Sequence, residues 1–398
     1  MDTERSLLPA VRPALAAACP SLTDGTAADA VSGVIPSFAA APSSTAEVSA
    51  LLREAAAAGL AVVPRGAGTG LAWGAPPSRC DLVVDLCSMD QVVEHEAGDL
   101  VARVQAGATI GQLAVAFGSA GQQLALDVPA EATVGGVVAH AGGKVVKNVA
   151  GYDLGKLFAG SQGTLGVITE AAFRLHPLPA AVAWVTAEFG PAGRAGAVTA
   201  VAAAAGSQLV PSAVELDWPG GSQRPLRVGV LLEGTGPGVA ERATQMSELL
   251  AAPGGAVTVA ETAPARWGVL PDSVTVVRVS FWVSALGPVL DALAAAGAAA
   301  GTRPAVSGPA GAGALYACLD PGTSDADAAR FVTLLKERVA GALESGGPRG
   351  GVTVLTAPPA VLAASPDGAV PGLALMRAVK DQFDPEHRMF PGRFRGGD

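Results

Sequence analysis

The sharpest chemical signal in the chain is a seven-residue loop, Pro64-Arg65-Gly66-Ala67-Gly68-Thr69-Gly70. Glycine lacks a Cβ atom, so successive backbone N–H groups in this loop can converge on one anion, and the guanidinium of Arg65 suits paired phosphate oxygens. A diphosphate is the natural ligand. The loop is not a P-loop, because no Gly-Lys-Ser/Thr follows, and Leu71 stands at the last glycine of the dinucleotide fingerprint. A glycine-rich loop after a strand is more often an ordinary tight turn, so other segments must decide.

The elements that would position this loop can be predicted on both sides of it. Ser44 and Glu47 stand at capping-box spacing before an alanine- and leucine-rich helix that ends at Gly59. A short apolar strand over 60–63 then runs directly into the loop. Two further strands and a short amphipathic helix are expected after it, over 81–86, 100–105 and 110–118.

A second glycine-dense zone, 132–166, is followed by a proline-punctuated boundary, and a domain edge is expected near residue 180. Beyond it the pattern alternates between strands (226–232, 274–283, 352–355) and helices (239–250, 286–296, 325–342). This alternation predicts helices on one face of an antiparallel sheet, an α+β arrangement. A last helix is expected over 373–383.

Composition excludes several classes of protein. The net charge is −9 and no basic run occurs, which argues against a surface that tracks nucleic-acid phosphates. The four cysteines (Cys19, Cys80, Cys87, Cys318) form no CxxC pair and have no histidine at metal-ligand spacing, so no metal site is expected. The uncharged stretch 195–214 is broken by glycine, serine and proline and is interpreted as helix plus strand, so no transmembrane segment is expected. The first residues lack a secretory signal, and the expected location is cytoplasmic.

Four motifs occur in the order found in FAD-linked oxidases of the vanillyl-alcohol oxidase type, which the chain therefore resembles. They are the loop 64–70, Ala132-Thr133-Val134-Gly135-Gly136, Gly151-Tyr152-Asp153-Leu154, and the segment 160–170. Within that family, the segments 143–154 and 73–77 most resemble the FAD-binding subunits of glycolate oxidases. The resemblance is strong over 36–180 and moderate over the last dozen residues.

The resemblance implies the fold, the cofactor and most of the site. It implies a helical lead (1–35), a PCMH-type FAD-binding domain of α+β class (36–180), an α+β cap domain (181–370) and a C-terminal return (371–398). The cofactor would be FAD. Its diphosphate would lie on Pro64, Arg65, Gly66, Ala67, Gly68, Thr69 and Gly70. Thr133, Val134, Gly135 and Gly136 would pass beneath the cofactor as a strand and turn, and Gly163, Thr164, Gly166, Val167 and Ile168 would line its adenosine end. Asp127 would approach the flavin ring.

The chain departs from this family in two places. Several tens of residues normally separate Gly136 from the segment that begins at Lys144, so the FAD domain carries an apparent internal deletion. The metal-binding His-x-Gly-Asp-Gly-Asn-x-His stretch of related 2-hydroxy-acid dehydrogenases is also absent. The catalytic residue is left unassigned, and the candidates are His140, His387 and Arg393. Arg393 ends a Phe390-Pro391-Gly392-Arg393 turn, where it could stabilise negative charge or simply pin the chain end.

The resemblance implies a subunit of a glycolate oxidase-type complex, in which hydride passes from a small 2-hydroxy acid to FAD and electrons continue to an iron–sulfur partner subunit. A catalytic flavin subunit would be the second partner, since the metal motif is absent here. Two alternatives stay open: a stand-alone FAD-dependent oxidoreductase of alcohols or 2-hydroxy acids, and a flavin-free scaffold subunit.

Overall fold

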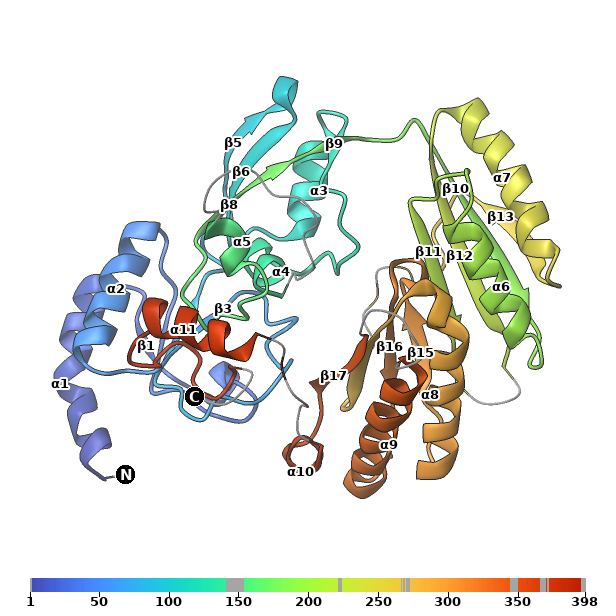
Figure 1. Ribbon diagram of the computed structural model, residues 1–398. Coiled ribbons are helices and arrows are strands. Elements are labelled where there is room, and N and C mark those ends of the chain that lie inside the picture. Colours follow the sequence, from blue (N-terminus) through green and yellow to red (C-terminus); the bar gives the residue numbers. More distant parts are fainter. Residues whose placement is uncertain are drawn as a thin grey trace. The chain divides into compact units, whose positions relative to one another are not determined.

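The computed structural model describes residues 2–140, 154–220, 224–265, 267, 269, 273–343, 350–365, 370 and 372–394. The part of the sequence resemblance over 143–153 lies outside these residues. The chain forms two compact units, Met1–Leu178 with Gly368–Asp398, and Pro179–Asp367. Each unit is built around its own sheets (Figure 1).

The first unit begins with a four-stranded sheet of order β1-β2-β4-β3. Its elements are α1 (Asp2–Ala18), β1 (Thr23–Asp24), β2 (Phe38–Ala40), α2 (Thr45–Ala57), β3 (Val62–Arg65) and β4 (Leu82–Asp85). Strands β2 and β3 both run parallel to β4, whose fully buried Leu82, Val83 and Val84 fit a strand covered on both faces. Ser44 caps α2 as predicted, accepting a 3.2 Å hydrogen bond from the Glu47 N–H, and β3 delivers the chain into the glycine loop.

A three-stranded antiparallel sheet follows in the same unit, of order β5-β6-β8. Its elements and neighbours are β5 (Val92–Glu96), β6 (Val101–Gln105), α3 (Ile110–Gly118), β7 (Gln122–Gln123), α4 (Val134–His140), α5 (Leu154–Phe158), β8 (Glu170–Arg174) and β9 (His176–Pro177). The alternating side chains Ala102 and Val104 of β6 pack with Leu113 and Phe117 of α3 in one buried cluster. The predicted strand and turn at Val134 is wrong, since this segment is the helix α4. The Val134 side chain is buried in the same cluster, and a helical turn at this position allows that burial.

The second unit is one eight-stranded sheet of order β13-β10-β12-β11-β15-β16-β14-β17, antiparallel at every described pairing. Its strands are β10 (Ala181–Phe189), β11 (Ala213–Trp218), β12 (Leu226–Gly234), β13 (Ala256–Ala260), β14 (Val276–Ser280), β15 (Ala305–Gly308), β16 (Ala314–Cys318) and β17 (Gly351–Thr356). Its main helices are α6 (Arg194–Ala205), α7 (Gly236–Ala251), α8 (Leu286–Ala300) and α9 (Asp325–Leu343), and α10 (Pro359–Ala364) follows β17. The predicted α+β class is confirmed, with the four main helices packed against one sheet (Figure 1).

The sheet of the second unit is assembled from two halves of the same topology. Each half runs strand, helix, strand, strand, helix, strand, first from β10 to β13 and then from β14 to β17. The two halves meet where β11 pairs with β15, so that α6 and α8 are the corresponding first helices of the two halves. The sequence pattern predicted the alternation but not this repeat.

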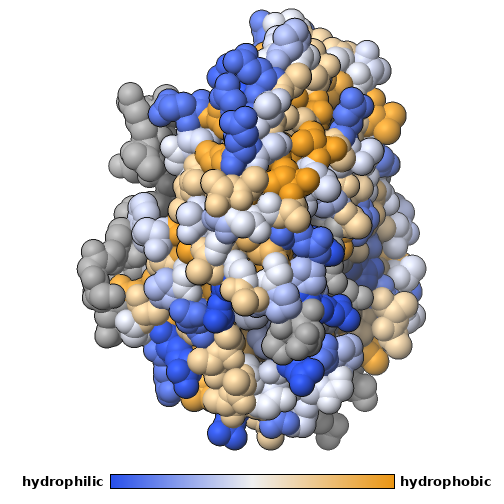
Figure 2. Space-filling view, turned by 90° about the vertical axis from the view of Figure 1, so that its right-hand side faces the viewer, coloured by the Kyte–Doolittle hydropathy of each residue, from blue (hydrophilic) through white to orange (hydrophobic). Residues whose placement is uncertain are grey.

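Helix α8 lies within the one stretch, Val283–Ala300, that is long and apolar enough to cross a membrane, among the residues the structure describes. Leu286, Val289, Leu290 and Leu293 on this helix are fully buried in the core of the second unit. The apolar composition of α8 is therefore explained by its burial in the protein core. On the face seen in Figure 2, hydrophobic residues lie in small groups among hydrophilic ones.

The C-terminal part of the chain belongs to the first unit, and its helix α11 (Leu373–Phe383) has the predicted bounds. The segment after α11 pairs with the edge of β3, where the Val62 N–H donates to the Arg388 carbonyl and the Phe390 N–H to the Val62 carbonyl, both at 2.9 Å. Lys380 and Asp384 form a buried ion pair of 2.6 Å beneath this segment. The C-terminal segment is thus held to the strand that carries the glycine loop.

Asp384 makes the stability of the first unit dependent on pH. Burial alone would raise the pKa of Asp384, but hydrogen bonds from Lys380 and from the N–H groups of Met389 and Arg388 outweigh it and lower the pKa. The stabilisation is present above the unfolded-state pKa of about 3.9 and is lost as pH falls through the lower folded-state value. Urea unfolding should therefore give a lower free energy at about pH 3 than at pH 7. Asp384→Asn should flatten this dependence, and an unchanged slope in the variant would contradict the assignment.

Candidate functional site

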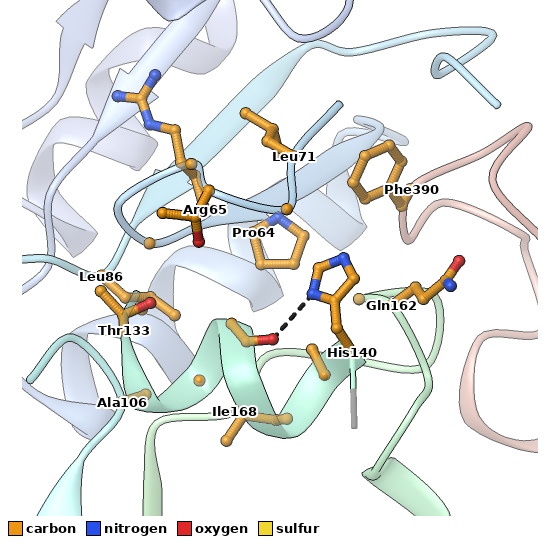
Figure 3. A pocket seen from close by; sticks show the side chains of 18 of the residues that line it. Pro64, Arg65, Leu71, Leu86, Ala106, Thr133, His140, Gln162, Ile168 and Phe390 are labelled. Carbon is orange, nitrogen blue, oxygen red and sulfur yellow. Dashed lines mark hydrogen bonds between the residues drawn. The ribbon is translucent and has the colours of Figure 1, made fainter. Parts of the chain in front are cut away.

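Three glycine-bearing segments of the first unit surround one pocket: the loop 64–71, the helix α4 with Thr133, and the loop 162–168 (Figure 3). Phe390 and Arg393 of the C-terminal segment complete its wall. The cavity between them measures about 70 Å³. A cavity of this size fits a small anionic group, and any larger ligand must extend beyond it.

The glycine loop presents unpaired backbone donors. In the described part of the chain, none of the N–H groups of Gly66, Ala67, Gly68 and Thr69 donates a backbone hydrogen bond. Gly68 has a φ of +81°, and a Cβ built on it would meet nothing within 4 Å, so this turn faces open space. Successive N–H groups that carry partial positive charge and lack partners form an anion-binding concavity.

The segments approach one another most closely at glycine positions. A Cβ atom on Gly66 would lie 2.0 Å from the Thr133 Oγ1, and one on Gly163 would lie 2.8 Å from the Pro64 Cγ. Real Cβ atoms do not approach other atoms this closely. The loop 64–71 can therefore pack against the other two walls only because these residues have no side chain.

The guanidinium of Arg65 is engaged in ion pairs with two carboxylates. Its Nε and Nη2 donate to the Asp85 Oδ2 at 3.1 and 2.8 Å, and Nη2 also donates to the Asp29 Oδ1 at 3.1 Å. In Figure 3 the guanidinium points away from the side chains of His140 and Gln162. Parallel strands β3 and β4 place Arg65 opposite Asp85, so the pairing follows from their register. An anion in the pocket would be held by the loop amides, with Arg65 holding the loop.

Replacing Arg65 with glutamine should consequently affect stability more than ligand affinity. The variant leaves two partly buried carboxylates without their cation, and we expect a loss of about 1–3 kcal/mol in the free energy of unfolding. Urea denaturation and FAD titration of the same preparations would compare the two effects. A variant with unchanged stability but lost FAD binding would restore the predicted contact between the guanidinium and the diphosphate. Arg103→Gln is the control, because Arg103 pairs with Glu94 and Glu170 at an exposed position.

His140 ends α4 inside the pocket. Its Nδ1 lies 2.8 Å from the Gly136 carbonyl oxygen, and since a carbonyl only accepts, Nδ1 carries the hydrogen. Burial lowers the pKa of His140 and the nearby charge of Arg393 lowers it further. Backbone hydrogen bonds with Gly136 and Gly70 only partly oppose them, so the neutral form prevails at pH 7. The buried Nε2 faces Gly70, where a Cβ would lie 3.0 Å away. His140 therefore presents a neutral imidazole ring to the pocket.

Arg393 is a buried cation of the pocket wall, with only 3% of its surface exposed. It donates to the carbonyl oxygens of Trp73 and of Leu71, the latter at 2.7 Å, and its guanidinium lies 4.1 Å from the centre of the Phe390 ring. Burial lowers the pKa of Arg393 to about 10, which leaves it charged at neutral pH. Arg393 therefore pins the chain end to the 71–73 segment and places a positive charge at the pocket. Its stabilisation of negative charge stays a prediction.

The structure brings together most of the predicted site residues. The predicted residues that line the pocket are Pro64, Arg65, Gly66, Gly68, Thr69, Gly70, Thr133, Gly135, Gly136, Gly163, Gly166 and Ile168, together with the candidates His140 and Arg393.

Six predicted residues do not line the pocket: Ala67, Asp127, Val134, Thr164, Val167 and His387. Val134 and Thr164 are buried elsewhere, and Asp127 is exposed. His387 lies 2.9 Å from Asp381 after α11. Sequence reasoning missed Leu71, Leu86, Ala106, Ala139, Gln162 and Phe390. The only feature of the sequence that could have pointed to these residues as pocket residues is a position next to a motif.

Comparison with known proteins agrees with this geometry. Residues 36–152 match a family model described as "FAD binding domain". The cofactor of this domain is FAD. The glycolate oxidase subunit GlcD of Bacillus subtilis is 32% identical to this chain, and a D-lactate dehydrogenase of Archaeoglobus fulgidus is 36% identical. The matches cover 36% and 34% of this chain and 38% of each relative, so they span well under half of the proteins they come from.

Solved structures extend the likeness to the whole fold. p-Cresol methylhydroxylase with bound substrate superposes with a TM-score of 0.71 at 14% identity, over 99% of this chain and 97% of that one. The 4-ethylphenol oxidase of Gulosibacter chungangensis gives the same TM-score at 14% identity, over 98% and 97%. The chain has the fold of these vanillyl-alcohol oxidase type proteins, as predicted.

The residues present suit FAD at its diphosphate. The unpaired amides of the loop supply the donors that two phosphate groups need, and the glycines allow close approach. The cavity of about 70 Å³ is too small to hold a flavin ring as well, and the His140 side chain on its wall lies against Gly70. The rest of the cofactor would therefore extend beyond this cavity.

Proposed function

We propose that this chain is an FAD-linked oxidoreductase that acts on small 2-hydroxy acids, as the counterpart of an FAD-binding subunit of glycolate oxidase. The observation that carries the proposal is the set of unpaired N–H groups from Gly66 to Thr69, which lie in a domain whose family binds FAD. The names of the relatives support the substrate class, since they include a glycolate oxidase subunit, a D-lactate dehydrogenase and D-2-hydroxyglutarate dehydrogenases.

FAD, when bound, supplies the two-electron acceptor for the hydride of the substrate. The protein contributes position and charge. The amides of 66–69 would bind the diphosphate, and the carboxylates of Asp29 and Asp85 would fix the loop through Arg65. Arg393 would stabilise negative charge that develops in the pocket, because a buried cation acts strongly in a low dielectric. His140 would present a neutral imidazole ring at the pocket wall.

We further propose that the chain works in a complex with a catalytic flavin subunit and an iron–sulfur subunit. The sequence lacks the histidine-rich metal motif of related 2-hydroxy-acid dehydrogenases, which favours an auxiliary subunit over a self-sufficient enzyme. The likeness to GlcD, whose name makes it one subunit among several, agrees with this arrangement.

The visible absorption spectrum of freshly purified protein tests the cofactor, and anaerobic titration tests the activity. We expect a flavin spectrum that bleaches with glycolate or D-lactate only when the partner subunits are added. Bleaching by the chain alone would favour the stand-alone oxidoreductase. Colourless protein whose melting temperature does not respond to added FAD would favour the flavin-free scaffold, an alternative that the small enclosed cavity supports.

A further inference from the structure

A second cavity, of about 940 Å³, lies wholly within the second unit and has no part in the pocket described above. Its walls come from both halves of the eight-stranded sheet. The first half contributes the start of α6 and Trp218 at the end of β11, and the second half contributes one side of α8 and the loop 301–304. The cavity therefore follows the junction at which β11 and β15 pair, where the repeated halves leave a groove between their first helices.

The groove is positively charged. Arg194, Arg224 and Arg303 line it, and Asp291 is the only carboxylate on its walls among the described residues. Arg194 forms a 3.3 Å ion pair with Asp291, and their side chains are 40% and 69% exposed. No ion pair of Arg224 or Arg303 occurs within the part of the chain that the structure describes. Two arginines thus present unneutralised guanidinium groups, although the protein as a whole carries a net charge of −9.

The remaining wall combines an aromatic ring with small side chains. Trp218 is half-buried, and the guanidinium of Arg194 lies 5.9 Å from the centre of its ring. Ala294 and Ala298 of α8 also line the groove, and larger side chains at these positions would take up some of its space. The buried Oγ1 of Thr302 on the same wall has no hydrogen-bond partner among the described residues. Within the described part of the chain, the groove consequently offers an indole ring beside the Arg194 guanidinium, one unsatisfied hydroxyl and two cationic groups without ion pairs.

We infer that this groove binds a nucleoside diphosphate or a closely similar phosphorylated ring compound. Arginine guanidinium groups pair with phosphate oxygens through two parallel hydrogen bonds, which matches Arg224 and Arg303. An indole ring stacks with a flat base, which matches Trp218. The Thr302 hydroxyl can donate to or accept from a polar atom of the ligand. The site is separate from the FAD loop and does not depend on the proposed redox function.

The probe for this site is ADP, titrated calorimetrically into the full chain that has been loaded with FAD and freed of excess cofactor. We expect saturable binding of one ADP, with adenosine and inorganic pyrophosphate each binding about tenfold more weakly or less, because each lacks one of the two recognised parts. The double variant Arg224→Gln/Arg303→Gln should weaken ADP binding about tenfold or more, and Trp218→Leu should weaken it severalfold.

Arg227→Gln is the matched control, since Arg227 lies on β12 of the same unit, pairs with Glu188 and Asp217, and does not line the groove. Gly66→Ala, altered at the FAD loop, should keep ADP binding in the groove. Equal ADP affinity in the double variant and the unaltered protein would overturn the inference, as would an absence of binding at about 1 mM ADP. Pyrophosphate binding as tightly as ADP would overturn the role of Trp218. Loss of ADP binding in Gly66→Ala alone would show that ADP occupies the FAD loop.

Discussion

Replacing Gly66 with alanine should reduce the affinity for FAD by about 10- to 100-fold, because overpacking a close contact costs about 1–3 kcal/mol. The added Cβ would lie 2.0 Å from the Thr133 Oγ1 and 3.0 Å from its Cβ, so the glycine loop and the start of α4 must separate. That separation displaces the N–H groups of 66–69, which the diphosphate needs together. Flavin content after purification and FAD titration by quenching of flavin fluorescence would measure the loss.

Two variants make this expectation specific. Gly118→Ala, at the end of α3, adds a Cβ that meets nothing within 4 Å and should bind FAD normally. Thr133→Ala removes the Oγ1 and Cγ2 atoms that collide in Gly66→Ala, so combining the two substitutions should restore part of the affinity. Full FAD affinity in Gly66→Ala alone would mean that the loop does not hold the diphosphate in the arrangement seen here.

Lys380→Met should lower the free energy of unfolding by about 3–5 kcal/mol, the range found when one member of a buried ion pair is removed. Lys380 is fully buried and donates to the Asp384 Oδ2 at 2.6 Å, the Thr164 carbonyl at 2.8 Å and the Met389 carbonyl at 3.0 Å. Methionine fills similar space but has no N–H group, so the Asp384 carboxylate and the two carbonyl groups each lose a hydrogen-bond donor. Chemical denaturation at pH 7 would measure the change.

Arg377→Met is the control for this substitution, because Arg377 is exposed on the same helix. Its effect should stay within about 0.5 kcal/mol, as for most surface substitutions. The double variant Lys380→Met/Asp384→Asn should be more stable than Lys380→Met, since it no longer buries an unpaired charge. If Lys380→Met costs less than about 1 kcal/mol, the ion pair does not hold the C-terminal segment to the first unit.

Local patterns in the sequence predicted the elements well. The helices α3 and α11 begin and end as expected, because Thr109 is a strong N-cap and because both helices carry an apolar stripe along one face. The alternation beyond residue 180 predicted an antiparallel sheet with helices, because period-2 and period-3.6 patterns are both short-range. The glycine motifs predicted close approach of backbone segments, although their order alone could not show which glycines touch.

Charge pairing was decided only in three dimensions. Arg65 stands beside the glycines in sequence, which suggested a phosphate ligand, yet the register of β3 on β4 sets it against Asp85, twenty residues away. The helical form of α4 also depended on tertiary structure, since Val134 is buried against α3 and β6. Local glycine content there gave no preference for a helix.

The sequence by itself determined the class of fold, the glycine loop and its fitness for a diphosphate, because those properties depend on residues that are adjacent along the chain. The tertiary structure decided which cations are neutralised, where His140 and Arg393 lie, and that two halves of one sheet enclose an arginine-lined groove. These features join residues from distant elements. Their free energies depend on burial and on distances that no local pattern encodes.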